Sequence, residues 1–88
     1  GSKCFITNAG TPITRCILTA AVTGEDENGQ KELSTIIVPS DAQGFSVGPP
    51  YRKLGWRASD TRPVYFERCS VPEANLLGRS GRGLAQFM

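Results

Sequence analysis

The chain has 88 residues, 39% of them hydrophobic, and its ten Lys and Arg residues outnumber its eight Asp and Glu residues to give a net charge of +2. This length fits one small domain whose single core is only just sufficient for stability. The basic residues are scattered through the sequence, so no nucleic-acid partner is expected. No apolar stretch is long enough for a membrane span, and the first residues do not resemble a signal peptide.

The three cysteines, Cys4, Cys16 and Cys69, are widely spaced and form no CxxC pair. This spacing argues against a disulfide framework and against a zinc site. We expect reduced, mostly packed thiols, as in the cytoplasm or the mitochondrial matrix. The chain has no His, which removes the commonest general base and metal ligand, so we predict no catalytic residue and no metal site within it.

Residues 3–8, with the sequence KCFITN, are expected to form the first strand. In a regular strand successive side chains alternate, so Phe5 and Thr7 would share one face and Ile6 would lie on the other. One face would then combine a flat ring with a hydroxyl donor. Such a surface suits the edge of a planar heteroaromatic ligand.

The next segment predicts a hairpin. Residues 15–23 are rich in apolar and β-branched residues, and an acidic turn containing Asn28 and Gly29 follows. This dipeptide is the strongest short-range signal for a hairpin. Residues 33–38 supply the returning strand before a proline ends it. We therefore predict an antiparallel hairpin over residues 15–38.

Two further strands are expected in the middle of the chain. Residues 45–48 predict a short strand, and the two prolines that follow interrupt the sheet because proline cannot lie inside a ladder. Residues 51–59 predict a strand that bends at Gly55. We expect the large ring of Trp56 to be buried over that bend.

The last third of the chain predicts one more strand, then a loop and the start of a helix. Residues 61–72 read as a half-buried strand because Val64 and Phe66 alternate with polar neighbours. A loop follows, and residues 84–88 have the composition of a helix start. The chain as a whole predicts an all-β fold, a small antiparallel β-barrel or a two-sheet sandwich of about five to seven short strands with a helix start at its C-terminus.

Five stretches of the sequence, taken in order, resemble one family: GSKCFITNAG, STIIVPSDAQGFSVG, KLGWRASDT, VYFERCSVPEANLLG and GRGLAQFM. They are similar to the middle β-domain of the acyl-CoA dehydrogenases, flavoenzymes that oxidise acyl-CoA thioesters to the enoyl form. The resemblance covers residues 1–88. It implies a segment of a longer polypeptide with helical domains on either side.

In that family the aromatic-Ile-Thr triplet lies against the isoalloxazine ring of FAD. By motif position, the resemblance implies that Phe5, Ile6 and Thr7 contact this cofactor. Many members carry Trp at the first position. Phe5 keeps the flat apolar ring but lacks the indole N–H donor.

The resemblance also implies partners. These are an acyl-CoA substrate, an electron-transfer flavoprotein or similar acceptor, and further subunits of a homo-oligomeric parent. The carboxylate that removes the α-proton would come from the C-terminal helical domain, so the isolated chain is expected to be inactive.

Two alternatives stay open: a related flavin oxidase such as an acyl-CoA oxidase or a nitroalkane oxidase, and a non-catalytic β-barrel module that binds nucleic acid or peptide.

The stretch GWRASDT is interpreted as structural. Asp60 and Thr61 are typical turn residues that satisfy nearby backbone groups. Arg57 and Arg62 could pair with Asp60, with Glu67 or with a neighbouring domain. An exposed pair of this kind would contribute less than about 1 kcal/mol.

Overall fold

The computed structural model describes residues 1–88, which divide into two compact units. Unit 1 comprises Gly1–Ile17 and Pro39–Ser70, and unit 2 comprises Leu18–Val38 and Val71–Met88. The chain forms two three-stranded sheets, which confirms the all-β prediction in its two-sheet form; there is no closed barrel. No helix in the structure has both the length and the apolar character needed to span a membrane.

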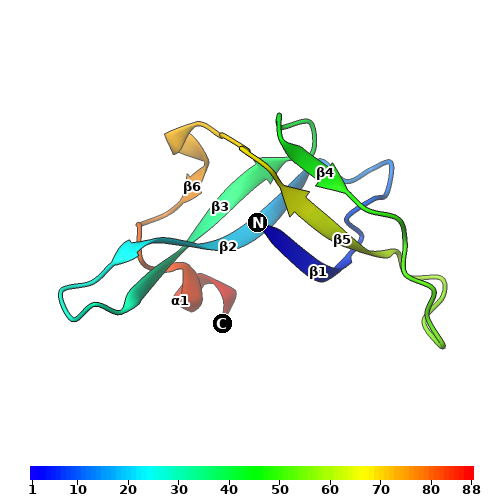
Figure 1. Cartoon of the computed structure of the whole chain (residues 1–88), viewed down its shortest axis with the longest axis horizontal. Coiled ribbons are helices and arrows are strands. Elements are labelled where there is room, and N and C mark those ends of the chain that lie inside the picture. Colours follow the sequence, from blue (N-terminus) through cyan, green and yellow to red (C-terminus); the bar gives the residue numbers. More distant parts are fainter. The chain divides into compact units, whose positions relative to one another are not determined.

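The sheet of unit 1 consists of β1 (Ser2–Thr7), β5 (Thr61–Phe66) and β4 (Phe45–Val47). Figure 1 shows β5 between the other two strands, and it pairs antiparallel with both of them. Two predicted strands, over residues 45–48 and at the start of 61–72, are therefore confirmed. The second ends earlier than predicted.

The core of unit 1 lies along β5. Val64 is fully buried, Phe66 is half-buried and Tyr65 between them is exposed, which confirms the predicted alternation. The rings of Phe45 and Phe66 pack together with 5.3 Å between their centroids. The two residues are also directly paired across β4 and β5, the arrangement in which cross-strand aromatic rings stabilise a sheet.

Unit 2 contains the hairpin and the C-terminal segment. Its sheet is formed by β2 (Cys16–Glu25), β3 (Lys31–Pro39) and β6 (Leu76–Leu77), with β3 in the centre. The first two residues of β2 and the last residue of β3 belong to unit 1. A short 3₁₀ helix (Glu73–Asn75) precedes β6, and α1 (Gly83–Phe87) ends the segment. The predicted hairpin and the predicted helix start are both confirmed. The 3₁₀ helix and β6 lie where a plain loop was expected.

The turn of the hairpin is held by one carboxylate. Asp26 Oδ1 accepts hydrogen bonds from the backbone N–H groups of Asn28 and Gln30, each at 2.8 Å. Gly29 has φ +75°, a left-handed conformation that costs glycine little. The acidic turn is therefore closed by local bonds, as is typical of Asp in turns.

The buried centre of unit 2 is polar. Ser34 has no exposed surface, and its Oγ lies 2.6 Å from Thr23 Oγ1 and accepts the Gly81 N–H at 2.9 Å. Gly83 approaches the same strand so closely that a Cβ there would lie 2.8 Å from Ser34 Cα. Hydroxyl bonds and a close backbone approach thus connect the hairpin to the C-terminal segment.

Residues 51–60 form a loop, so the prediction of a bent strand over 51–59 is wrong. Lys53 Nζ donates to the backbone oxygen of Ser59 at 2.6 Å and to Thr61 Oγ1 at 2.8 Å. The two bonds of the Lys53 ammonium group, and not pairing with a neighbouring strand, hold this segment closed. Trp56 is 87% exposed, so the prediction that its ring is buried is also wrong.

All three cysteines are free, but only Cys69 is partly buried. Cys4 and Cys16 are exposed, so the prediction of mostly packed thiols is wrong. Cys4 lies on β1, which pairs on one side only, and Cys16 is the first residue of β2. Positions at sheet edges and strand ends leave such side chains at the surface.

Candidate functional site

The predicted triplet, residues 5–7, lies on β1 at a break in the strand pairing. Lys3 pairs with Val64 of β5. Ile6, three residues further along β1, pairs with Arg62, which is only two residues away on β5. One extra residue is therefore accommodated on β1. This is a β-bulge, a feature that redirects a side chain.

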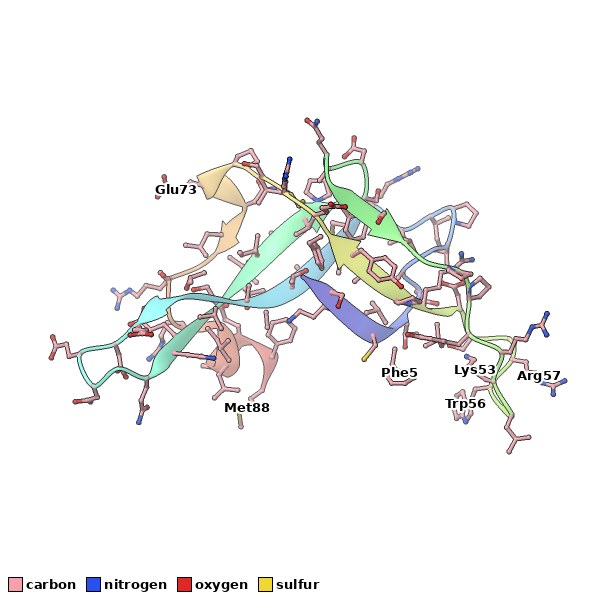
Figure 2. All side chains as sticks on the ribbon, in the orientation of Figure 1. Phe5, Lys53, Trp56, Arg57, Glu73 and Met88 are labelled. Carbon is pink, nitrogen blue, oxygen red and sulfur yellow. The ribbon has the colours of Figure 1, made fainter.

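The bulge places Phe5 in an unusual conformation. Its φ is +56°, in the left-handed region that costs a side-chain-bearing residue about 1–2 kcal/mol. The ring is 71% exposed, and Figure 2 shows it projecting away from the sheet of unit 1. Regular alternation is thus interrupted, although Phe5 and Thr7 are both exposed while Ile6 is half-buried.

One aromatic neighbour contacts the Phe5 ring. The centroid of the Tyr51 ring lies 5.1 Å from that of Phe5, with an angle of 35° between the ring planes. The Tyr51 backbone N–H donates to the carbonyl oxygen of Thr61 at 3.0 Å. Sequence reasoning missed Tyr51, because a contact between residues so far apart in the chain has no local signal.

Ile6 lines a shallow groove beside the bulge. The groove has a volume of about 500 Å³ and is bounded by residues of β1, residues of β5 and Tyr51. Tyr51 therefore contacts the exposed ring and also lines the groove. The structure brings the predicted Ile6 and the unpredicted Tyr51 together at one surface.

Asp60 fixes the end of β1. Its Oδ1 accepts a hydrogen bond from Arg62 Nε at 2.7 Å, and its Oδ2 accepts the Gly10 N–H at 3.0 Å. Its backbone oxygen accepts the Asn8 N–H at 2.8 Å, directly after Thr7. The hydrogen bond from Arg62, followed by that from Gly10, lowers the pKa of the Asp60 carboxyl below its ordinary value.

The structural interpretation of GWRASDT is consistent with these contacts. The ion pair between Arg62 and Asp60 is formed, whereas Arg57 Nε donates to the carbonyl oxygen of Lys53 at 3.1 Å. The reach of Asp60 to Gly10, fifty residues away, was not foreseen. A residue expected to satisfy local groups instead connects two distant segments of unit 1.

Comparison with known proteins gives the chain its family. The model of the family described as "Acyl-CoA dehydrogenase, middle domain" matches residues 1–69. The chain belongs to this family. The resemblance stated from the five sequence stretches is thereby confirmed.

Relatives of this middle domain agree with the match. The "Probable acyl-CoA dehydrogenase YngJ" of Bacillus subtilis (strain 168) is 42% identical over 88 residues, which is 100% of this chain and 23% of the relative. An "Acyl-CoA dehydrogenase" of the same organism is 45% identical over 83 residues, 94% of this chain and 21% of the relative. The chain spans only 21–23% of the length of these two relatives.

A solved structure supports the same conclusion for the fold. The acyl-CoA dehydrogenase from Bacillus anthracis, solved in complex with FAD, superimposes with a TM-score of 0.83 and 33% sequence identity. The match covers 97% of this chain and 13% of that one.

Proposed function

We propose that this chain is the FAD-contacting middle domain of an acyl-CoA dehydrogenase. It would work within a polypeptide that also carries helical domains on either side. The observation that carries the proposal is the exposed Phe5 ring, held at positive φ on a bulge in a chain of this family. Strain of this kind is found mostly at functional sites.

The residues of the site fit the cofactor chemically. Isoalloxazine has an apolar benzenoid end and a polar edge of ring nitrogens and carbonyl oxygens. The exposed ring of Phe5 offers a flat apolar surface, and the exposed Thr7 carries a hydroxyl that can both donate and accept a hydrogen bond. Ile6 between them supplies apolar contact at the neighbouring groove.

The chain's share of the reaction is positional. FAD, when bound, supplies the hydride-accepting chemistry by which the acyl-CoA thioester is oxidised. Phe5 would shield the ring system from water, and Thr7 would hydrogen-bond to its polar edge. No candidate base is predicted in this chain, so the carboxylate that takes the α-proton would come from another domain.

Partners and location follow from the same proposal. The substrate would be an acyl-CoA, the electron acceptor an electron-transfer flavoprotein or similar protein, and the full polypeptide a homo-oligomer. Exposed free thiols at Cys4 and Cys16 support a reducing compartment, the cytoplasm or the mitochondrial matrix. The names of the relatives favour a dehydrogenase over a flavin oxidase, and the family match disfavours a non-catalytic binding module.

Purification of the full-length polypeptide that carries this chain tests the proposal. We expect a yellow protein whose flavin absorbance falls when an acyl-CoA is added without oxygen. Phe5→Ala should weaken FAD binding, while Ile13→Ala, at a side chain that is 84% exposed in the same unit, should leave it unchanged. A colourless protein that gains no flavin on incubation with FAD would contradict the proposal.

A further inference from the structure

We propose that Tyr51 is a positioning residue: it holds the Phe5 ring in the orientation in which that ring meets the cofactor. The inference rests on the proposed function, since it assumes that Phe5 contacts FAD. It goes further by assigning a role to a residue outside the predicted triplet. It also states which property of Tyr51 matters, namely its ring and not its hydroxyl.

The Phe5 ring needs an external support. The residue is 71% exposed, so burial in a core does not fix its side-chain rotamer. β1 is an edge strand whose only neighbour in its sheet is β5. A contact that restricts the ring in the free protein would reduce the ordering cost of binding a planar ligand.

The backbone leading to Tyr51 is tethered at both ends. Gly48 N–H donates to the Pro63 carbonyl oxygen at 2.9 Å, and Tyr51 N–H donates to the Thr61 carbonyl oxygen at 3.0 Å. Between these bonds lie two prolines, whose rings restrict the backbone dihedral φ. The segment 48–51 is therefore a stiff arm fastened to β5.

The arm ends beside the bulge. Thr61, which accepts the hydrogen bond from Tyr51, pairs directly with Thr7 on β1. From this position the Tyr51 ring reaches Phe5 at a centroid distance of 5.1 Å and a tilt of 35°. That distance lies in the range in which aromatic pairs attract each other. The position of the Phe5 ring is thus linked, through Tyr51, to the centre of the sheet.

The rest of the loop, beyond Tyr51, does not provide this support. Trp56 is 87% exposed and also has a positive φ of +56°, and Figure 2 shows it on the loop with Lys53 and Arg57. Lys53 is engaged within that loop by its own hydrogen bonds. The aromatic ring that packs against Phe5 is that of Tyr51.

A double-mutant cycle in the full-length polypeptide tests the inference. FAD affinity is measured by titrating the apoprotein of the unchanged protein, Tyr51→Ala, Phe5→Ala and the double variant. We expect Tyr51→Ala to weaken binding roughly two- to tenfold, the size of an aromatic pair interaction. In the Phe5→Ala background the same change should have little effect, because Tyr51 acts through Phe5.

Tyr51→Phe is the matched control. It keeps the ring, so FAD affinity and the visible circular dichroism of the bound flavin should stay as in the unchanged protein. Tyr51→Ala should alter that spectrum, whereas a purely structural role would lower thermal stability and leave the spectrum of the bound flavin unchanged. The inference would be overturned if Tyr51→Ala lowered FAD affinity equally with Phe5 and with Phe5→Ala, or if Tyr51→Phe lowered FAD affinity.

The contact of Phe5 with FAD and the role of Tyr51 can be tested separately. If Phe5→Ala leaves FAD affinity unchanged, the proposed contact of Phe5 with the cofactor fails. If Phe5→Ala weakens binding but Tyr51→Ala does not, only the role of Tyr51 fails. Thermal unfolding of each variant identifies any loss of binding that results from misfolding.

Discussion

The two units place different residues at left-handed backbone positions: in unit 2 these are glycines, whereas in unit 1 most of them carry side chains. In unit 2 the conformation occurs at Gly29, in the hairpin turn, where φ is +75° and no side chain is strained. In unit 1 it occurs at four residues that carry side chains, among them Phe5, where φ is +56° and the side chain is a large ring. Ordinary turns place glycine at such positions. A phenylalanine there carries backbone strain, and strain of this kind clusters at functional sites.

Glycines at positive φ give the largest expected effect. Gly44 in unit 1 has φ +86°, and a Cβ there would lie 2.9 Å from Cys69 Cα, whereas a Cβ on Gly29 would meet nothing within 4 Å. Gly29→Ala should cost about 1–2 kcal/mol from conformation alone, and Gly44→Ala about 1–3 kcal/mol more from overlap. Urea unfolding of the purified chain measures both. Equal losses would show that the close approach at Gly44 is relieved without cost.

The buried hydroxyl of unit 2 comes next. Ser34→Ala removes the acceptor of the Gly81 N–H and should destabilise the chain by about 1–3 kcal/mol, the cost of a buried unpaired donor. Thr23→Val removes one partner of Ser34 only and should cost less. Urea unfolding provides the comparison. FAD affinity of the full-length Ser34→Ala protein should not change, and a change would link unit 2 to the cofactor.

Phe5→Gly tests whether strain is retained for function. Without a side chain, the left-handed conformation no longer costs stability, which raises the free energy of unfolding by about 1–2 kcal/mol. The added flexibility of glycine and the loss of the ring contact lower it by a similar amount. Stability should therefore stay within about 1 kcal/mol of the original, although FAD affinity should fall. Ile6→Gly, at a half-buried position, is the control and should destabilise clearly. A strongly destabilised Phe5→Gly would mean that the ring supports the fold.

The ion pair of Asp60 should make the stability of the chain depend on pH. The folded pKa of Asp60 is lowered, so its stabilising contribution is complete above the pKa of the unfolded chain and is lost as the pH falls through the folded value. The difference in thermal midpoint between the original chain and Asp60→Asn should be constant near neutrality and should shrink below about pH 4. Asp26→Asn in the hairpin, which has no such ion pair in the structure, is the comparison. A difference that grows in acid would contradict the assignment.

Local chemistry explains what the sequence predicted correctly. The hairpin over residues 15–38 follows from segments rich in apolar and β-branched residues and from the turn at Asn28 and Gly29, all within one short segment. The triplet at Phe5 was recognised by its motif. Its bulge was not predicted, because the extra residue shows only in the pairing of β1 with β5, more than fifty residues later.

The wrong predictions, like the missed bulge, come from contacts that a local sequence pattern does not show. The segment over residues 51–59 was predicted as a bent strand, yet Lys53 satisfies the backbone of Ser59 with its side chain and closes a loop. The contact of Tyr51 with Phe5 depends on how that loop is fastened to β5. A strand-like sequence pattern does not show where a side chain, and not a neighbouring strand, supplies the hydrogen bond to a backbone group. Contacts of single side chains, such as Lys53 with Ser59 and Phe5 with Tyr51, therefore decided what sequence reasoning missed.

The tip of this loop gives the smallest expected effect. Leu54 is fully exposed, and it follows Lys53, whose bonds hold the loop closed. Leu54→Ser should therefore change the free energy of unfolding by less than about 0.5 kcal/mol, as is usual for surface sites. Lys53→Met, which removes the bonds to Ser59 and Thr61 while keeping an apolar stem, should cost more. If urea unfolding shows the reverse order, the bonds of Lys53 to Ser59 and Thr61 are not what holds the loop closed.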